Sequence, residues 1–149
     1  MSLTVGAAAP DFSAKDQRGH THTLSDFRGQ WLVLYFYPQD DTPGCTAEAC
    51  SFRDSYSDLQ QLAQVLGVSG DSIASHTQFA DKFQLPFPLL SDPDSIISKA
   101  YGADGLLFKK RVTFVIDPTG KIAHIYDKVD AKKHADRVLK DLKKLQMTQ

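Results

Sequence analysis

The sequence predicts an α/β fold in which a central mixed β-sheet is flanked by helices and preceded by an N-terminal β-hairpin. Residues 31–37 are seven consecutive apolar residues, a run that suits a strand covered on both faces. Short apolar strands then alternate with segments of helical periodicity. The chain has 149 residues, of which 42% are hydrophobic, and shows no internal repeat or linker. We therefore expect a single domain over residues 1–149.

The first half of the chain is expected to supply the hairpin and two strands of the sheet. The turn signal Asp16-Gln17-Arg18-Gly19 separates two short extended stretches and predicts a hairpin over 12–24. After the apolar strand, hydrophobic residues recur every three or four positions, which predicts one helix over 46–64. A second buried strand follows over 65–68.

The second half continues the alternation of strands and helices. In chain order we expect a helix over 72–83, a strand over 87–90, a short helix over 95–101, two strands over 112–117 and 122–126, and a helix over 131–145. The turn Pro118-Thr119-Gly120 joins the last two strands. In sheets of this kind the reactive site lies beyond the carboxyl ends of the strands.

Composition and charge disfavour several classes of partner. The formal net charge is -1, so no overall electrostatic attraction favours nucleic acid or an anionic membrane. No run approaches the roughly 18 apolar residues of a membrane span. Residues 1–10 lack the basic start and long apolar stretch of a signal peptide. We therefore expect a cytoplasmic protein with no membrane or nucleic-acid partner.

Cys45 and Cys50 are the two cysteines of the chain, too few for a disulfide scaffold. Thr42 is expected to be the N-cap of the helix and Pro43 its first residue, which places Cys45 in the first turn. The positive end of a helix favours the thiolate form of a cysteine. A reactive thiolate with a second thiol nearby is typical of redox chemistry.

Arg111 and Cys50 each have two interpretations. If strand 112–117 is antiparallel to strand 31–37, Arg111 lies within reach of Cys45 and remains charged; otherwise it is a surface arginine. On an intact helix the Cα atoms of Cys45 and Cys50 are about 8–9 Å apart, beyond the limit of about 7 Å for a disulfide. Either the helix unwinds when the bond forms, or Cys50 is a buried apolar residue.

Other thiol chemistry fits less well. Zinc sites need four ligands at characteristic spacing, and two thiols with scattered histidines do not supply them. A dithiol exchange protein is disfavoured because the chain has no Cys-x-x-Cys.

The sequence resembles the peroxiredoxins, specifically the peroxiredoxin Q (bacterioferritin comigratory protein) subfamily, over essentially the whole chain. The matching stretches are Gly6-Ala7-Ala8-Ala9-Pro10-Asp11-Phe12, Phe36-Tyr37-Pro38, Thr42-Pro43-Gly44-Cys45-Thr46, Glu48-Ala49-Cys50, Phe52-Arg53-Asp54 and Arg111-Val112-Thr113-Phe114-Val115-Ile116-Asp117. The resemblance implies a thioredoxin-like fold with an N-terminal hairpin, in agreement with the elements expected above.

The resemblance also implies an activity, the thiol-dependent reduction of hydrogen peroxide and organic hydroperoxides. Cys45 becomes a sulfenic acid, a disulfide with Cys50 follows, and thioredoxin or a similar dithiol reduces it, with no metal or organic cofactor. We expect a monomer. The implied site residues are Cys45 as peroxidatic cysteine, Cys50 as resolving cysteine of the same subunit, Thr42 and Arg111 as ligands of peroxide and thiolate, and Pro38 and Pro43 as walls of the pocket.

One alternative remains open, a redox sensor that passes its oxidation to a partner protein. Rapid turnover of peroxide with a reductant would identify an enzyme, whereas a trapped mixed disulfide with a regulator would favour the sensor.

Overall fold

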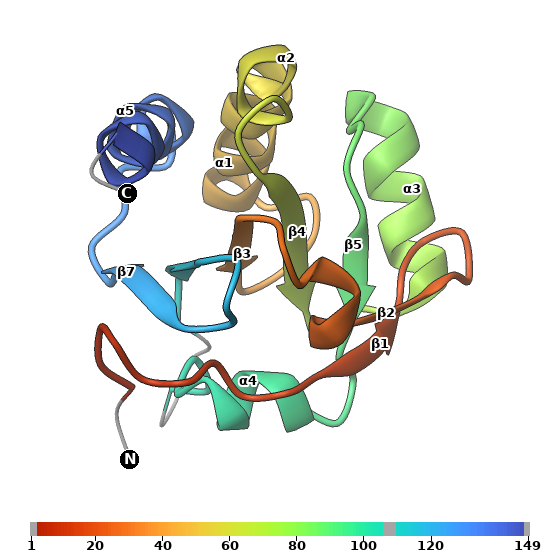
Figure 1. Cartoon of the computed structure of the whole chain (residues 1–149). Helices are drawn as coiled ribbons and strands as arrows, with labels where there is room; N and C mark the ends of the chain where they lie inside the picture. Colours follow the sequence, from red (N-terminus) through yellow and green to blue (C-terminus); the bar gives the residue numbers. More distant parts are fainter. Residues whose placement is uncertain (1–2, 106–109, 148–149) are drawn as a thin grey trace.

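The computed structural model describes residues 3–105 and 110–147, and its centre is a five-stranded sheet of order β5-β4-β3-β6-β7 (Figure 1). The strands β4 and β5 run parallel to β3, whereas β6 is antiparallel to β3 and β7 is antiparallel to β6. The expectation of a mixed sheet is therefore confirmed. The strand bounds are β3 Leu32–Phe36, β4 Gln64–Ser69, β5 Leu89–Ser91, β6 Val112–Ile116 and β7 Ile122–Tyr126.

Helices cover both faces of the sheet, as predicted (Figure 1). One face carries α1 (Pro43–Asp54), α2 (Tyr56–Leu59), α3 (Ile73–Phe83) and α5 (His134–Met147), and the other carries α4 (Ile96–Ala100). Alternate residues of β3 enter the two hydrophobic cores: Val33 and Tyr35 pack with α1, α3 and α5, while Leu34 packs on the opposite side. Because all five residues of β3 are buried, the apolar run 31–37 is explained by coverage on both faces.

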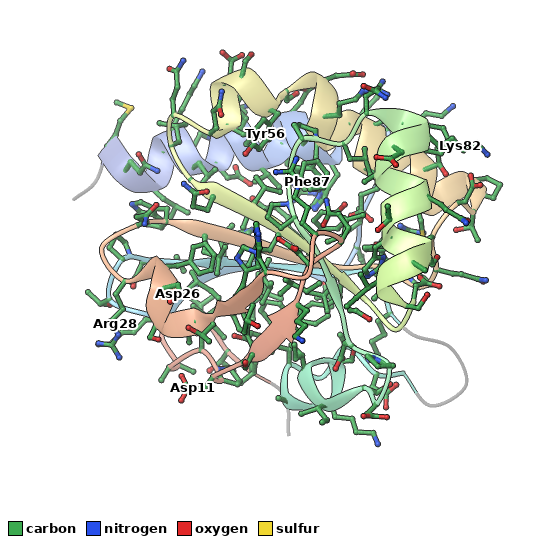
Figure 2. The ribbon with its side chains drawn as sticks, turned by 90° about the vertical axis from the view of Figure 1, so that its right-hand side faces the viewer. Asp11, Asp26, Arg28, Tyr56, Lys82 and Phe87 are labelled. Carbon is green, nitrogen blue, oxygen red and sulfur yellow. The ribbon has the colours of Figure 1, made fainter. Side chains whose placement is uncertain are left out.

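The expected N-terminal hairpin is formed by β1 (Ser13–Lys15) and β2 (Thr21–Thr23), followed by the short helix η1 (Leu24–Phe27). Its turn is fastened to the edge of the sheet by Gln17, which donates to the carbonyl of Phe87 at 3.1 Å and accepts from the amide of Leu89 at 2.8 Å. The hairpin thereby covers part of the exposed edge at β5. Phe87 and Tyr56 of α2 lie together on the face of the sheet that α1, α2, α3 and α5 cover (Figure 2), and their rings are 6.0 Å apart.

The prediction of one helix over 46–64 is wrong. α1 ends at Asp54, Ser55 interrupts the helix, α2 adds a single turn, and Gln64 already belongs to β4. The two helices bury Phe52 and Leu59 in the same core. Periodicity therefore continues across the bend, and a hydrophobic pattern alone does not reveal it.

The last helix begins at His134 instead of 131, because residues 131–133 form a turn in which the amide of Lys133 donates to the carbonyl of Asp130. At the true start of α5, the amide of Ala135 donates to Ser51 Oγ of α1 at 3.1 Å. A hydroxyl of one helix thus caps the next. Among the described residues, no helix combines the length and the apolar character that a bilayer span requires.

Candidate active site

Cys45 lies in the first turn of α1, at the carboxyl end of the central strand β3. Thr42 is the N-cap, with extended φ and ψ of -99° and 155°, and Pro43 is the first helical residue, as predicted. The Thr42 hydroxyl does not cap the helix, however, because its Oγ1 donates to the carbonyl of Gln39 at 2.9 Å. The acceptor lone pairs of Oγ1 are therefore available to a ligand.

Arg111 meets Cys45 because β6 is antiparallel to β3. Their register pairs Val112 with Phe36, so the residue before β6 lies beside the end of β3. The Arg111 Nη2 atom is 3.5 Å from Cys45 Sγ, and the Arg111 side chain is only 23% exposed. The alternative that Arg111 is a surface residue is therefore wrong.

Gly44 gives the guanidinium the space it occupies. A Cβ placed on Gly44 would lie 2.8 Å from Arg111 Nη2, closer than carbon and nitrogen normally approach. A side chain at this position would push the end of the Arg111 side chain away from its place beside Cys45, so glycine suits the geometry of the site.

Glu48 is a second partner of Arg111 that the sequence reasoning missed. Arg111 Nη1 donates to Glu48 Oε1 at 2.7 Å, and Glu48 is fully buried one turn after Cys45. Burial raises the pKa of Glu48 to about 7, against the opposing effect of the Arg111 charge. Burial acts to lower the pKa of Arg111, but Glu48 and Cys45 raise it above its usual value. In the sequence, the spacing of three residues between Cys45 and Glu48 indicates that both lie on one face of the helix.

His134 and Thr113 close the site behind Glu48. His134 Nε2 and Thr113 Oγ1 lie 2.8 Å apart, whereas His134 Nε2 is 3.9 Å from Glu48 Oε2, too far for a hydrogen bond. Burial, assisted by the positive charges of Arg137 and Arg111, lowers the pKa of His134 to about 4. At neutral pH His134 is therefore uncharged, and it is not a counter-ion for Glu48.

The remaining predicted residues surround the helix start. Pro38 lies two residues after the end of β3 and, like Pro43, is exposed to solvent, whereas Cys45 itself is only 1% exposed. Cys50 is half-buried on the same helix, and both cysteines are free thiols. Because α1 is continuous from Cys45 to Cys50, the two thiols are held apart in this conformation.

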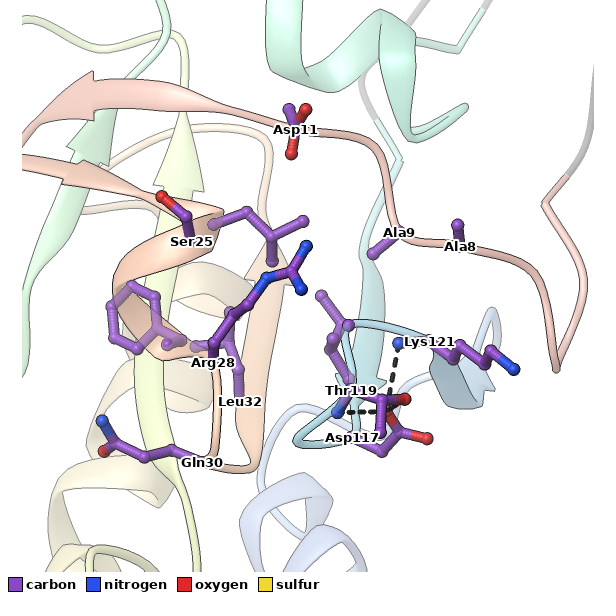
Figure 3. Close-up of a pocket in the computed structure, with 14 residues that line it drawn as sticks. Ala8, Ala9, Asp11, Ser25, Arg28, Gln30, Leu32, Asp117, Thr119 and Lys121 are labelled. Atoms are coloured by element: carbon purple, nitrogen blue, oxygen red, sulfur yellow. Dashed lines mark hydrogen bonds between the residues drawn. The ribbon is translucent and has the colours of Figure 1, made fainter.

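A separate cavity of about 320 Å³ lies at the other end of the sheet, between the start of β3 and the end of β6 (Figure 3). Asp117 at its rim accepts hydrogen bonds from the backbone amides of Thr119 and Lys121 and from the Thr119 hydroxyl. These bonds build the turn between β6 and β7, and the cavity has no contact with Cys45.

Comparisons with known proteins agree with this site. The profile of the AhpC/TSA family matches residues 5–125. The chloroplastic peroxiredoxin Q of Arabidopsis thaliana is 48% identical over 146 residues, which cover 95% of this chain and 68% of that protein. The putative peroxiredoxin bcp of Coxiella burnetii (strain RSA 493 / Nine Mile phase I) is 43% identical over 148 residues, with 93% and 98% covered.

Solved structures show the same likeness. Peroxiredoxin Q of Xylella fastidiosa, crystallised as a cysteine-to-serine mutant, superimposes with a TM-score of 0.92 at 35% identity, over 98% of this chain and 99% of that one. The bacterioferritin comigratory protein of Xanthomonas campestris, studied for alkyl peroxide reduction through trapped intermediate and ligand complexes, gives a TM-score of 0.87 at 36% identity, over 96% and 97%. The predicted thioredoxin-like fold is therefore confirmed. The chain belongs to the AhpC/TSA family, as a thiol-dependent peroxidase of the peroxiredoxin Q and bacterioferritin comigratory protein group.

Proposed function

We propose that this protein reduces hydrogen peroxide and organic hydroperoxides with Cys45 as the peroxidatic cysteine and Cys50 as the resolving cysteine. The observation that carries the proposal is the contact of 3.5 Å between Arg111 Nη2 and the sulfur of Cys45, at the N-terminus of α1. A permanent cation and a helix N-terminus both favour the thiolate, which is the reactive form of cysteine.

In the first step the Cys45 thiolate attacks one peroxide oxygen and the O–O bond breaks. Sulfur is oxidised to a sulfenic acid, and the other oxygen leaves as an alkoxide or hydroxide that takes a proton from water. Arg111 and the free amides of the first helical turn stabilise the negative charge that develops on the leaving oxygen. Thr42 Oγ1 accepts a hydrogen bond from the peroxide, since its own proton is already donated to Gln39.

In the second step the Cys50 sulfur attacks the sulfenic sulfur of Cys45. The S–O bond breaks, the oxygen leaves as water, and a disulfide forms. Because both residues belong to α1, part of the helix between them must unwind before the sulfurs can meet. Pro38 and Pro43 shape the solvent side of the pocket in which this exchange takes place.

The third step requires an external dithiol, which we propose is thioredoxin or a protein like it. Thiol–disulfide exchange transfers two electrons to the Cys45–Cys50 bond and restores both thiols. The alkyl peroxide activity studied in the Xanthomonas campestris protein supports organic hydroperoxides as substrates. We further propose that the protein works as a cytoplasmic monomer without a metal or organic cofactor.

Serine variants of the two cysteines test these roles. Cys45→Ser is expected to abolish peroxide reduction, whereas Cys50→Ser keeps one equivalent of reduction and loses turnover driven by thioredoxin. Consumption of peroxide is measured first at one equivalent and then in the steady state. An equal loss of the first turnover in both variants would contradict the assignment, and a wild-type protein that forms mixed disulfides without turnover would identify a redox sensor instead.

A further inference from the structure

A buried polar network that the proposed reaction does not use lies beneath the loop that leads to Cys45. Asp40 precedes Thr42 by two residues and is 8% exposed, and His76 of α3 is completely buried. The His76 Nδ1 atom lies 2.7 Å from Asp40 Oδ2. The pair thus connects α3, which contributes no reacting group, to the segment that carries Thr42.

Three side chains hold the carboxyl group of Asp40 in place. Tyr37 donates its hydroxyl to Asp40 Oδ1 at 2.6 Å, and Ser75 donates to Asp40 Oδ2 at 2.8 Å. The third is His76, whose Nδ1 contacts the same Oδ2 atom. A buried polar network with all its partners present is rigid.

His76 joins Asp40 to the sheet through both of its ring nitrogens. Nδ1 lies against the Asp40 carboxyl group, and Nε2 lies 3.0 Å from the carbonyl oxygen of Leu90 in β5. A buried imidazole needs a hydrogen-bond partner at each ring nitrogen, and His76 has both. His76 therefore ties Asp40 to α3 and to β5.

The loop 38–42 is held mainly through Asp40. Pro38, Gln39 and Asp41 are exposed, whereas Asp40 is the most buried side chain of the loop. Asp41 has a left-handed φ of 56°, an unfavourable conformation for a residue other than glycine. Its ion pair with Lys82 lies at the surface and is weak.

The main chain of the loop is fastened at the same point. The amide of Asp40 donates to Asp71 Oδ2 at 2.8 Å, and Ser69 donates its hydroxyl to the same oxygen at 2.6 Å. Asp40, Asp71 and His76 each offer one atom that could bind a metal ion, and these atoms lie within 4.8 Å of one another. All three residues are already hydrogen-bonded to protein groups through such atoms.

We propose that His76 is a positioning residue for peroxide reduction, which it serves through Asp40. Their buried hydrogen bond fixes the loop so that the Thr42 acceptor and the start of α1 remain aligned with the sulfur of Cys45. This role rests on the proposed function of Cys45. Loss of the pair is expected to impair the reaction with peroxide, which needs Thr42, more than alkylation of Cys45, which does not.

Two replacements of His76 test the proposal by separating the loss of the hydrogen bond from the change in side-chain shape. His76→Leu removes both ring nitrogens, whereas His76→Asn keeps one N–H directed at Asp40. We expect the rate constant of Cys45 with hydrogen peroxide to fall at least tenfold in His76→Leu and to recover in part in His76→Asn. The rate with iodoacetamide, measured on the same preparations, is expected to change less than threefold. If the leucine variant does not fold, the asparagine variant alone should show the same selective loss.

The matched control is Asp92→Asn. Asp92 is also a buried carboxylate with three donors, the amides of Ile97 and Ser98 and the Ser98 hydroxyl, but it lies at α4 on the other face of the sheet. Its replacement should lower the melting temperature without changing the ratio of the peroxide rate to the iodoacetamide rate. The proposal is overturned if this ratio stays within twofold of wild type in both His76 variants, or if Asp92→Asn changes it equally. Failure of the proposed function itself would be recognised separately, by peroxide reduction in Cys45→Ser.

Discussion

Arg111 divides its two terminal nitrogens between a thiol and a carboxylate, Nη2 toward Cys45 and Nη1 toward Glu48. Two groups that can lose a proton therefore share one cation at the end of the sheet. The Glu48 contact fixes the plane of the guanidinium, and the Cys45 contact brings its charge to the reacting sulfur.

Replacement of Arg111 by leucine is expected to slow the reaction with peroxide by about 10²–10³-fold, the usual effect of losing one donor to a developing negative charge. The pH profile of Cys45 alkylation should also move to higher pH. Both are measured by stopped-flow and mass spectrometry, with Arg28→Leu, an exposed arginine near the other end of the sheet (Figure 2), as control. Equal profiles in wild type and Arg111→Leu would show that Arg111 does not act on Cys45.

Glu48 is expected to make the folded protein less stable as pH rises from about 4.5 to 7. Burial raises the pKa of Glu48 from its ordinary value of 4.5 to about 7, so the native state binds more protons than the unfolded state in this window. The contribution of the group to stability is therefore greatest below the window and is lost on passing through it. The loss amounts to about 1–3 kcal/mol.

Urea unfolding at pH 5 and pH 8 measures this effect. In Glu48→Gln, which cannot ionise, the decrease in unfolding free energy between the two values should be smaller than in wild type by this amount. Asp26→Asn, at an exposed acidic residue of η1, is the control. The same decrease in wild type and Glu48→Gln would show that Glu48 is ionised normally.

For a single residue, the sequence predicts its place in the site where that place follows from the direction of a strand or from the position of the residue around a helix. Arg111 was placed beside Cys45 by assuming an antiparallel strand, which the register confirms. The spacing of three residues from Cys45 places Glu48 on the same helix face, but neither this spacing nor the sequence around His134 shows that the two side chains are buried. Only the packing of α1 on α5 shows that water is excluded there.

Among the elements, α1 carries both cysteines, and two hydroxyls, one within α1 and one at Ser55 directly after it, bind the first turn of α5. Ser51 Oγ accepts from the amide of Ala135, and Ser55 Oγ donates to Asp136 Oδ1 at 3.1 Å. A change in the second half of α1 must therefore reach the first turn of α5.

Oxidation is expected to increase hydrogen exchange over residues 45–56 and, because its cap is lost, in the first turn of α5. Exchange monitored by mass spectrometry on reduced and disulfide forms measures both regions, with β4 as an internal reference. At high peroxide concentration, overoxidation of Cys45 should compete with the slow closure of the disulfide. The hypothesis would be falsified by superimposable exchange profiles over 45–56 in a sample whose Cys45–Cys50 bond mass analysis confirms.

Helix and strand types were predictable because the strands of the sheet are short continuous apolar runs, whereas the helices repeat apolar residues every three or four positions. The ends of the elements were harder to predict. Neither the break at Ser55 nor the turn that delays the start of α5 changes the order of apolar residues, so the hydrophobic pattern does not reveal them.

The direction of one strand organises the whole molecule. Because β6 is antiparallel to β3, its first residue lies at the same end of the sheet as the last residue of β3. A parallel β6 would place Arg111 at the opposite end, near the cavity of Figure 3. The mixed sheet is thus what brings cation and thiol together.

The exposed surface is consistent with the proposed monomer. The large hydrophobic side chains most exposed among the described residues are Val5, Ile96 and Met147, at 60%, 69% and 83%, and they belong to three different segments. Scattered apolar residues do not make an interface. Light scattering after gel filtration should give the mass of one chain, 16.5 kDa, at micromolar concentration. A mass of two chains that Ile96→Lys returns to one would place a dimer interface at α4.

The hydroxyl of Ser51 that caps α5 has a practical consequence as well. If α1 unwinds on oxidation, loss of this cap would carry a change at the buried sulfur of Cys45 to the start of the C-terminal helix, beside the exposed Lys133. An environment-sensitive dye attached at Lys133 would report, by its emission, whether α1 is wound or unwound, without touching the peroxide or the reductant. The protein labelled with such a dye would therefore serve as a fluorescent sensor of peroxide.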